Sequence, residues 1–178
     1  VEGHWLEMVV KVTAGLGLRR EEICGLKWES VDFQRRVVHI KEARTAYGAT
    51  VVQKETKNRS SMRTLFMPDE LYELLRREKA RQEQERAIRG GDYAASGHVV
   101  LDREGLPYSP NALSLAFTRF VRKNHLPRLT LHGLRHTFAT IASAQGVPLF
   151  DIGKAMGHST PATTGRIYTH LVDRTHEE

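Results

Sequence analysis

The stretch LTLHGLRHTFAT, residues 129–140, places three basic side chains within about one helical turn. They are His132, Arg135 and His136. In a helix, residues three apart share a face, so His132 and Arg135 could reach one ligand together. Arginine offers a planar fork of donors that matches a phosphate group, and it stays charged at neutral pH. The group therefore favours an anion site, while packing with a hydrogen bond is the preferred interpretation for His136 alone.

A metal site is the alternative use of two histidines spaced four apart, as His132 and His136 are. The zinc-peptidase pattern requires a glutamate directly after the first histidine, and this chain has Gly133 at that position. Arg135 would also repel a cation held between the two rings. We therefore expect no metal here.

Three further basic residues lie in short stretches that could contribute to the same anion site. Arg19 follows GLGL, Lys57 lies in TKNRSSMR and His158 lies in MGHST. Any one of these residues indicates little by itself. Together with Arg135 and His132 they could surround a single phosphate group.

Tyr168 lies ten residues after His158, in ATTGRIYTHL. The pKa of a tyrosine hydroxyl, about 10, makes it a poor nucleophile unless a base or nearby cations assist it. A cluster of two arginines, one lysine and two histidines would supply that assistance. The alternative is an ordinary half-buried tyrosine, which the residue by itself does not exclude.

The basic charge of the chain is concentrated in two segments. The 178 residues carry a net charge of +6, with a pI of about 9.7, which leaves a nucleic acid, an anionic membrane or no specific partner open. Residues 35–63 hold eight lysines and arginines against two acids, and residues 105–170 hold seven against one. Residues 69–89 hold six of each sign. A localised excess of this kind favours a polyanion as the partner.

Length and cysteine content narrow the class of protein. The length suits one domain, and no apolar run approaches the roughly 18 residues of a membrane span. The single cysteine, Cys24, allows no internal disulfide and fits a reducing cytoplasm. The chain begins at Val1 rather than methionine and shows no secretory signal, so we expect an excised fragment of a longer protein.

Periodicity and capping signals predict a mainly α-helical α+β chain with one small, basic, antiparallel sheet. Helices are expected around Trp5–Val12, within 14–28, over 69–89, from Ser109-Pro110 onwards, over 130–145 and 148–156, and from Thr160-Pro161. Strands are expected over 35–43, 50–56, 63–68 and 98–101. The second half of the 69–89 helix is almost wholly polar and should be solvated. The predicted core stripe of the 130–145 helix is Leu131, Leu134, Phe138 and Ile141.

Four stretches in this order resemble the conserved boxes of the tyrosine recombinase, or phage integrase, family. GLGLRREEICGLKW resembles the first arginine box, and TKNRSSMRTLFMP resembles the lysine box on a β-hairpin. LTLHGLRHTFAT resembles the His-x-x-Arg box, and MGHSTPATTGRIYTH resembles the Gly-His-Ser box that leads to the nucleophile. One box alone would be weak, whereas four in order with all six expected functional residues are specific. The resemblance covers nearly the whole chain.

The resemblance implies a role for each matching residue. Tyr168 would attack the scissile phosphodiester and form a 3′-phosphotyrosine link. Arg19 and Arg135 would bind the non-bridging oxygens and stabilise charge in the transition state. Lys57 would protonate the departing 5′-oxygen as general acid.

Three more residues complete the implied site. His158 would donate a further hydrogen bond to the phosphate, and His132 would help to take the tyrosine proton or hold a phosphate oxygen. Glu22 is the supporting acid of the first box. The covalent link conserves the phosphodiester energy, so the resemblance implies no cofactor, no ATP and no required metal. Double-stranded DNA with recombination or attachment sites is the implied partner, and a membrane is not.

The resemblance also implies an organisation and a setting for the chain. Residues 1–178 would form the catalytic domain, with the N-terminal domain that clamps DNA outside this fragment. A homotetramer on DNA is implied, while a monomer stays open for the fragment alone. The setting would be the cytoplasm of a bacterium, with a bacterial or phage gene and a nucleoid-associated protein. Two departures from the family pattern are Gly133, where aspartate is common, and Met156, where leucine is usual.

Three functions stay open at this point. A site-specific DNA recombinase is favoured, because all six functional residues are present. The first alternative is a catalytically inactive relative that only binds DNA. The second is a type IB topoisomerase-like DNA strand transferase, which shares the phosphotyrosine chemistry.

Overall fold

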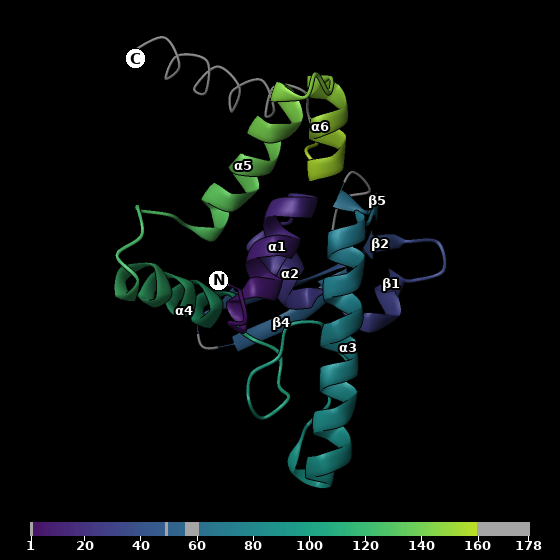
Figure 1. Ribbon diagram of the computed structural model, residues 1–178, viewed down its shortest axis with the longest axis vertical. Coiled ribbons are helices and arrows are strands. Elements are labelled where there is room, and N and C mark those ends of the chain that lie inside the picture. The colour runs from purple at the N-terminus through teal and green to yellow at the C-terminus, as the bar shows by residue number, and fades with distance from the viewer. Residues whose placement is uncertain (1, 49, 56–60, 160–178) are drawn as a thin grey trace.

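The computed structural model describes residues 2–48, 50–55 and 61–159, and within these ranges the chain is mainly helical (Figure 1). The helices are α1 (Leu6–Leu16), α2 (Arg20–Gly25), α3 (Asp69–Arg89), α4 (Pro110–Lys123), α5 (Leu131–Ala144) and α6 (Leu149–Met156). The strands are β1 (Val31–Asp32), β2 (Val37–Ile40), β3 (Glu42–Tyr47), β4 (Thr50–Glu55) and β5 (Arg63–Phe66). The α+β class is confirmed. Lys57, Tyr168 and the helix expected from Thr160 lie outside the described residues.

The strands form two antiparallel sheets instead of the single sheet expected from the sequence. One sheet has the order β1-β2-β5, and the other is the hairpin of β3 and β4. The predicted strand 35–43 divides at Lys41, because β3 turns away to lie against the end of α2. The contact is so close that a Cβ on Gly25 would stand 2.9 Å from the Cα of Ala43. In addition, the Gln53 side chain on β4 donates to the Gly25 carbonyl at 2.9 Å.

This close approach requires a residue without a side chain at position 25. Gly25→Ala should lower the free energy of unfolding by about 1–3 kcal/mol, because a methyl group would be forced against the backbone of β3. Gly15→Ala is the matched control, since its Cβ would meet only a Leu71 side-chain carbon at 3.8 Å. It should be neutral or stabilising by up to about 1 kcal/mol in the interior of α1. Urea unfolding measures both variants, and equal stability for the two would contradict the packing described.

One apolar core joins α1, α2, β2, the first turns of α3, α4 and the start of α5. Leu6, Val9 and Val12, spaced along one face of α1, are completely buried in it. Leu131 and Leu134 of α5 reach this core as predicted, but Ile141 is 52% exposed, so its predicted core position is wrong. The second half of α5 extends beyond the main core, where α6 packs on it (Figure 1).

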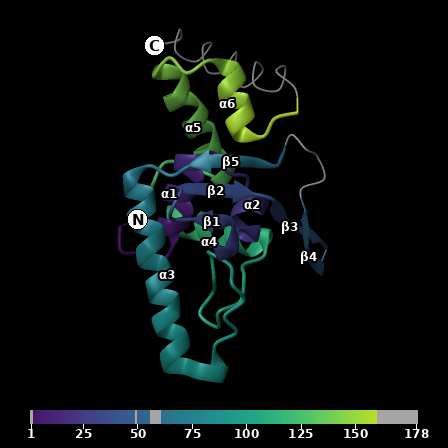
Figure 2. The same ribbon diagram turned by 90° about the vertical axis from the view of Figure 1, so that its right-hand side faces the viewer.

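The α5–α6 pair has its own small apolar cluster of Ala139, Ile152 and Met156, with Phe138 packed against it. Figure 2 shows this pair at one end of the molecule, directly beyond the β5 strand. Because this cluster is small, the position of α6 also depends on polar contacts with the rest of the chain.

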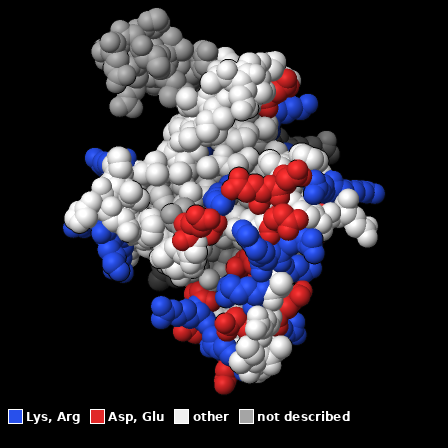
Figure 3. Space-filling view, in the orientation of Figure 1, with Lys and Arg blue, Asp and Glu red and all other residues white. Residues whose placement is uncertain are grey.

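The long helix α3 is solvated along most of its second half, as predicted. Gln82 is the exception: its side chain is buried, accepts from the Trp28 indole at 2.8 Å and donates to the Val99 carbonyl at 2.9 Å. Lysines and arginines alternate with acids over α3 in Figure 3, so this surface has no net excess of either sign to attract a polyanion.

The predicted strand at residues 98–101 is wrong. These residues form isolated bridges, Lys27 with His98 and Leu101 with Pro107, rather than a ladder. Val99 and Val100 are buried, which explains why this stretch is apolar, but the residues before and after it in the sequence form bends and turns. No helix in the described part of the chain has the length and hydropathy that a membrane span requires.

Candidate functional site

The N-terminus of α2 fixes Arg19 through Glu22. Arg19 precedes the helix in an extended conformation, and its backbone N–H donates to Glu22 Oε2 at 2.8 Å. The Arg19 guanidinium also donates through Nη1 to Glu22 Oε1 at 2.8 Å. Glu22 is only 2% exposed, while the Arg19 side chain is 35% exposed. The buried carboxylate therefore orients an arginine that keeps access to solvent.

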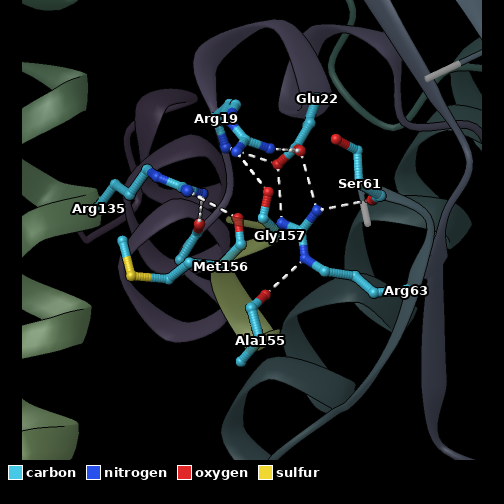
Figure 4. Close-up of polar contacts among 9 residues, drawn as sticks. Arg19, Glu22, Ser61, Arg63, Arg135, Ala155, Met156 and Gly157 are labelled. Carbon is cyan, nitrogen blue, oxygen red and sulfur yellow. Dashed lines mark hydrogen bonds and ion pairs between the residues drawn. The ribbon is translucent and has the colours of Figure 1, made fainter. Parts of the chain in front are cut away.

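Three arginines converge on the C-terminal end of α6 (Figure 4). Three consecutive carbonyl oxygens there each accept a hydrogen bond from a different arginine. The pairs are Ala155 with Arg63, Met156 with Arg135 at 2.7 Å, and Gly157 with Arg19 at 2.7 Å. The last carbonyls of a helix lack partners inside the helix and carry its negative dipole end, so they are natural acceptors for cations.

The turn after α6 needs glycine at position 157. Gly157 has a φ of +68°, and its N–H together with that of His158 caps the carbonyls of Lys154 and Gly153. A Cβ on Gly157 would stand 2.8 Å from Nη1 of Arg63 and 3.3 Å from Nη1 of Arg19. The glycine thus lets the chain pass beside two guanidinium groups and places His158 directly after them.

Arg135 crosses the interior between two helix ends. It is 3% exposed, and its guanidinium donates to the carbonyls of Gly17, after α1, and Met156, at the end of α6. Burial lowers the pKa of Arg135 to about 9, with further lowering by Arg19. The guanidinium therefore keeps its charge at neutral pH, and among the described residues it is carbonyl acceptors, not a carboxylate, that fix its position.

A cavity of about 270 Å³ opens beside these groups. Its polar lining comes from Arg19, Arg20, Glu21, Ser114, Thr130, His132 and Arg135. Arg20 donates to Glu21 at 2.7 Å and to the Ser114 hydroxyl at 3.1 Å, so Glu21, the acid in the described part of the lining, is paired. A concave, positively charged site of this kind can bind an oxyanion such as a phosphate group.

The two histidines of α5 occupy different environments. His132 is exposed at the cavity, and its ring meets the half-buried His136 ring edge-on at 4.4 Å between centroids. Burial lowers the pKa of His136, and His132 and Arg135 lower it further. His136 therefore packs behind His132, which agrees with its interpretation as a structural residue. Within the ranges that the structure describes, no three potential ligands among His, Cys, Asp and Glu gather around a possible metal position.

His158 is half-buried in the field of the arginines. Burial lowers its pKa to about 4, and Arg135, Arg19 and Arg63 contribute in that order. The imidazole is therefore neutral at pH 7, and one of its ring nitrogens carries a proton that it can donate.

The structure thus brings together five of the seven residues singled out in the sequence: Arg19, Glu22, His132, Arg135 and His158. Lys57 and Tyr168 lie outside the described residues. Sequence reasoning missed Arg63, whose side chain is 7% exposed and forms a two-bond ion pair with Glu22. The alternation of side chains along a strand is a signal that could have identified it. Arg63 and Leu65 are two residues apart and therefore share a face of the sheet, and Leu65 lies opposite the buried Val38.

The fold is that of tyrosine recombinase catalytic domains, and the comparisons with known proteins give the family. The chain belongs to the phage integrase family, whose sequence model matches residues 2–175. It is 27% identical to a "Tyrosine recombinase XerC-like" protein of Caldanaerobacter subterraneus subsp. tengcongensis, over 98% of this chain and 48% of that protein. It is 29% identical to the "Transposase from transposon Tn916" of Enterococcus faecalis, over 86% of this chain and 39% of that protein.

Solved structures agree with this assignment. The Tn1549 transposon integrase in complex with transposon right end DNA matches with a TM-score of 0.78 and 25% identity, over 92% of this chain and 54% of that one. The XerA recombinase matches in fold with a TM-score of 0.69, over 95% of this chain and 53% of that one. The chain therefore spans about half the length of the relatives it matches.

Proposed function

We propose that this chain is the part of a site-specific DNA recombinase, or integrase, that cuts and rejoins DNA through a 3′-phosphotyrosine intermediate. The observation that carries the proposal is the convergence of Arg19, Arg135 and His158 at the end of α6, beside a basic cavity. These groups come from three separate parts of the chain and together can bind one oxyanion. Membership of the phage integrase family supports DNA as the source of that phosphate.

The proposed step is a transesterification at phosphorus. The Tyr168 oxygen forms a bond to the phosphorus, and the bond from phosphorus to the 5′-oxygen breaks. His132 helps to accept the tyrosine proton, and Lys57 gives a proton to the departing 5′-oxygen. One phosphodiester, in the DNA, is exchanged for another, between DNA and tyrosine. The 5′-hydroxyl of another strand can therefore reverse the step without a nucleotide cofactor.

Two arginines stabilise the charge that develops during this step. Arg19 and Arg135 face the non-bridging oxygens, and the neutral His158 donates a hydrogen bond to one of them. Glu22 holds Arg19 in position for that contact. Because carbonyls and a buried carboxylate already orient these donors, little reorganisation is needed when the phosphate binds.

The proposed partner is double-stranded DNA. The "Tn1549 transposon Integrase" was solved with transposon and circular intermediate DNA, which supports this choice. We further propose that the complete protein, of which these 178 residues form the catalytic domain, acts as a homotetramer on paired DNA sites in a bacterial cytoplasm.

The test is covalent trapping with the full-length protein that contains this chain. Nicked duplexes from the ends of its genetic element are incubated with wild-type protein and with Tyr168→Phe. We expect a protein–DNA band that survives detergent, disappears on protease treatment and is lost in Tyr168→Phe, because the nucleophilic oxygen is gone. Tyr47→Phe, which alters an exposed tyrosine at the tip of the β3–β4 hairpin, is the matched control and should retain the band.

The other outcomes point elsewhere. An equal band in wild type and Tyr168→Phe would assign the nucleophile to another residue. If the protein binds DNA but forms no covalent protein–DNA band in wild type or in any variant, the alternative of an inactive relative that only binds DNA is favoured. Supercoil relaxation without strand exchange between two duplexes would favour the topoisomerase-like alternative.

A further inference from the structure

Arg63 carries a charge into the interior at the start of β5. Its side chain is 7% exposed, and four of its five N–H donors are engaged by protein groups. Nη1 and Nη2 donate to the two oxygens of Glu22, each at 2.9 Å. Nη1 also donates to the Ser61 carbonyl at 3.1 Å, and Nε donates to the Ala155 carbonyl.

These contacts separate Arg63 from the two arginines at the cavity. Arg19 and Arg135 line the cavity, whereas Arg63 is not among its lining residues in the described part of the chain. Because its donors are directed at Glu22, Ala155 and Ser61, the Arg63 guanidinium has no pair of N–H donors available for a phosphate group. Its effect on the reaction must therefore pass through the groups that it holds.

Arg63 joins three elements at one point (Figure 4). Through Glu22 it reaches the start of α2, where the same carboxylate orients Arg19. Through the Ala155 carbonyl it reaches the end of α6, three residues before His158. The apolar cluster under α6 is small, so the arginine–carbonyl contacts are a large part of what fixes this helix end.

We propose that Arg63 is a positioning residue for strand cleavage, which locks the end of α6 to Glu22 so that Arg19 and His158 face the same phosphate group. This inference rests on the proposed function. A buried ion pair contributes little net stability relative to a well-packed apolar pair, because desolvation offsets the attraction. The two parallel hydrogen bonds from Arg63 to Glu22 instead fix one relative position of the two side chains. A displacement of about 1 Å in the position of a catalytic group can cost about 100-fold in reaction rate.

Arg63→Lys is the decisive variant. Lysine keeps the positive charge, but its single ammonium cannot hold both oxygens of Glu22 and the Ala155 carbonyl in a planar fork. With nicked duplex and the full-length protein, we expect the single-turnover rate of covalent complex formation to fall by about 10- to 100-fold. The dissociation constant for DNA should change by less than about threefold, because Arg63 makes no phosphate contact.

Arg36→Lys is the matched control. Arg36 also pairs with a carboxylate, that of Asp69, and lies over the Tyr72 ring, away from the end of α6. Its cleavage rate should equal that of wild type. Arg63→Gln, with rates corrected for the folded fraction, serves if the lysine variant is poorly folded, and it should also be slowed by at least about tenfold.

A second measurement does not depend on cleavage. Within the described residues, the charged and titratable groups facing His158 are Arg19, which directly precedes α2, Arg63 from β5, and Arg135 and His136 from α5. If Arg63→Lys releases the end of α6, the His158 ring becomes more exposed to solvent, while the positive charge at position 63 is retained. Its pKa, followed by NMR in the free protein, should then rise from about 4 by about one unit. Arg36→Lys should leave it unchanged.

The outcomes distinguish the inference from the function on which it rests. Wild-type cleavage together with an unchanged rate in Arg63→Lys overturns the positioning role and keeps the proposed function. A slowed Arg63→Lys with an unchanged Arg36→Lys supports the role. If wild type forms no covalent link, the proposed function fails, and an unmoved His158 titration in Arg63→Lys would reject the positioning as well.

Discussion

Arg135→Lys should reduce the rate of covalent complex formation by about 100- to 1000-fold. The guanidinium of Arg135 is anchored by the carbonyls of Gly17 and Met156, and the same residue lines the basic cavity. A lysine of similar length can satisfy one of these carbonyls but cannot also present a second donor to a phosphate oxygen. The loss should therefore fall on the transition state, where the negative charge on the non-bridging oxygens is stabilised.

The measurement is single-turnover cleavage at saturating protein, compared with DNA affinity measured by titration. Affinity should fall by less than about tenfold, because one phosphate contact among many is weakened. Arg86→Lys on the exposed part of α3 is the control and should cleave at the wild-type rate. Cleavage by Arg135→Lys at more than a third of the wild-type rate would remove Arg135 from the proposed clamp.

Glu22→Gln should have the largest effect on stability. Its carboxylate is 2% exposed and forms ion pairs with Arg19 and with Arg63, whose side chain is 7% exposed. Removing this charge leaves the Arg63 guanidinium uncompensated in the interior, so the free energy of unfolding at pH 7 should fall by about 3–5 kcal/mol. Cleavage should fall as well, because Arg19 loses the acceptor that orients its side chain.

The loss of stability should depend on pH in a definite direction. Burial by itself would raise the pKa of Glu22, but hydrogen bonds and attraction from Arg63, with help from Arg19, hold it below its usual value near 4.5. The stabilisation is therefore complete above about pH 4.5 and is lost as the pH falls through the folded pKa. The stability gap between wild type and Glu22→Gln should narrow as the pH is lowered below this range.

Urea unfolding at a series of pH values from 7 downwards measures this gap. Glu29→Gln is the control, because Glu29 is 72% exposed and lies 3.8 Å from Lys27. Its cost should stay below about 1 kcal/mol at every pH. A gap for Glu22→Gln that is small at pH 7, or that widens in acid, would contradict the ion-pair arrangement.

Much of the local structure follows from the sequence alone. The Ser109 hydroxyl accepts from the Ala112 N–H, and the Thr130 hydroxyl accepts from the Gly133 N–H, so both helices begin where the sequence predicts their first residues. The i, i+3 spacing of His132 and Arg135 likewise brings both to the cavity. Capping and helical spacing act over a few residues, which is why they can be recognised without the fold.

Errors arose where position relative to the core decides the outcome. Ile141 continues the apolar stripe of its helix, but α5 has left the main core by that point. Residues 98–101 have the apolar character of a strand, yet in the described part of the chain they form only isolated bridges and no ladder. Residues 35–43 divide between two sheets because β3 packs closely against Gly25 at the end of α2, a contact that the segment's own residues do not record.

The sequence by itself determined the family, the stretches that resemble its conserved boxes and the residue types of the proposed site. Only the tertiary structure decided how the site is held together, because its contacts join residues far apart in the chain. Arg19 and the Gly157 carbonyl are separated by 138 positions, and Arg63 and the Ala155 carbonyl by 92. No local pattern records such contacts, since they exist only once the core has placed α2, β5 and α5 around the end of α6.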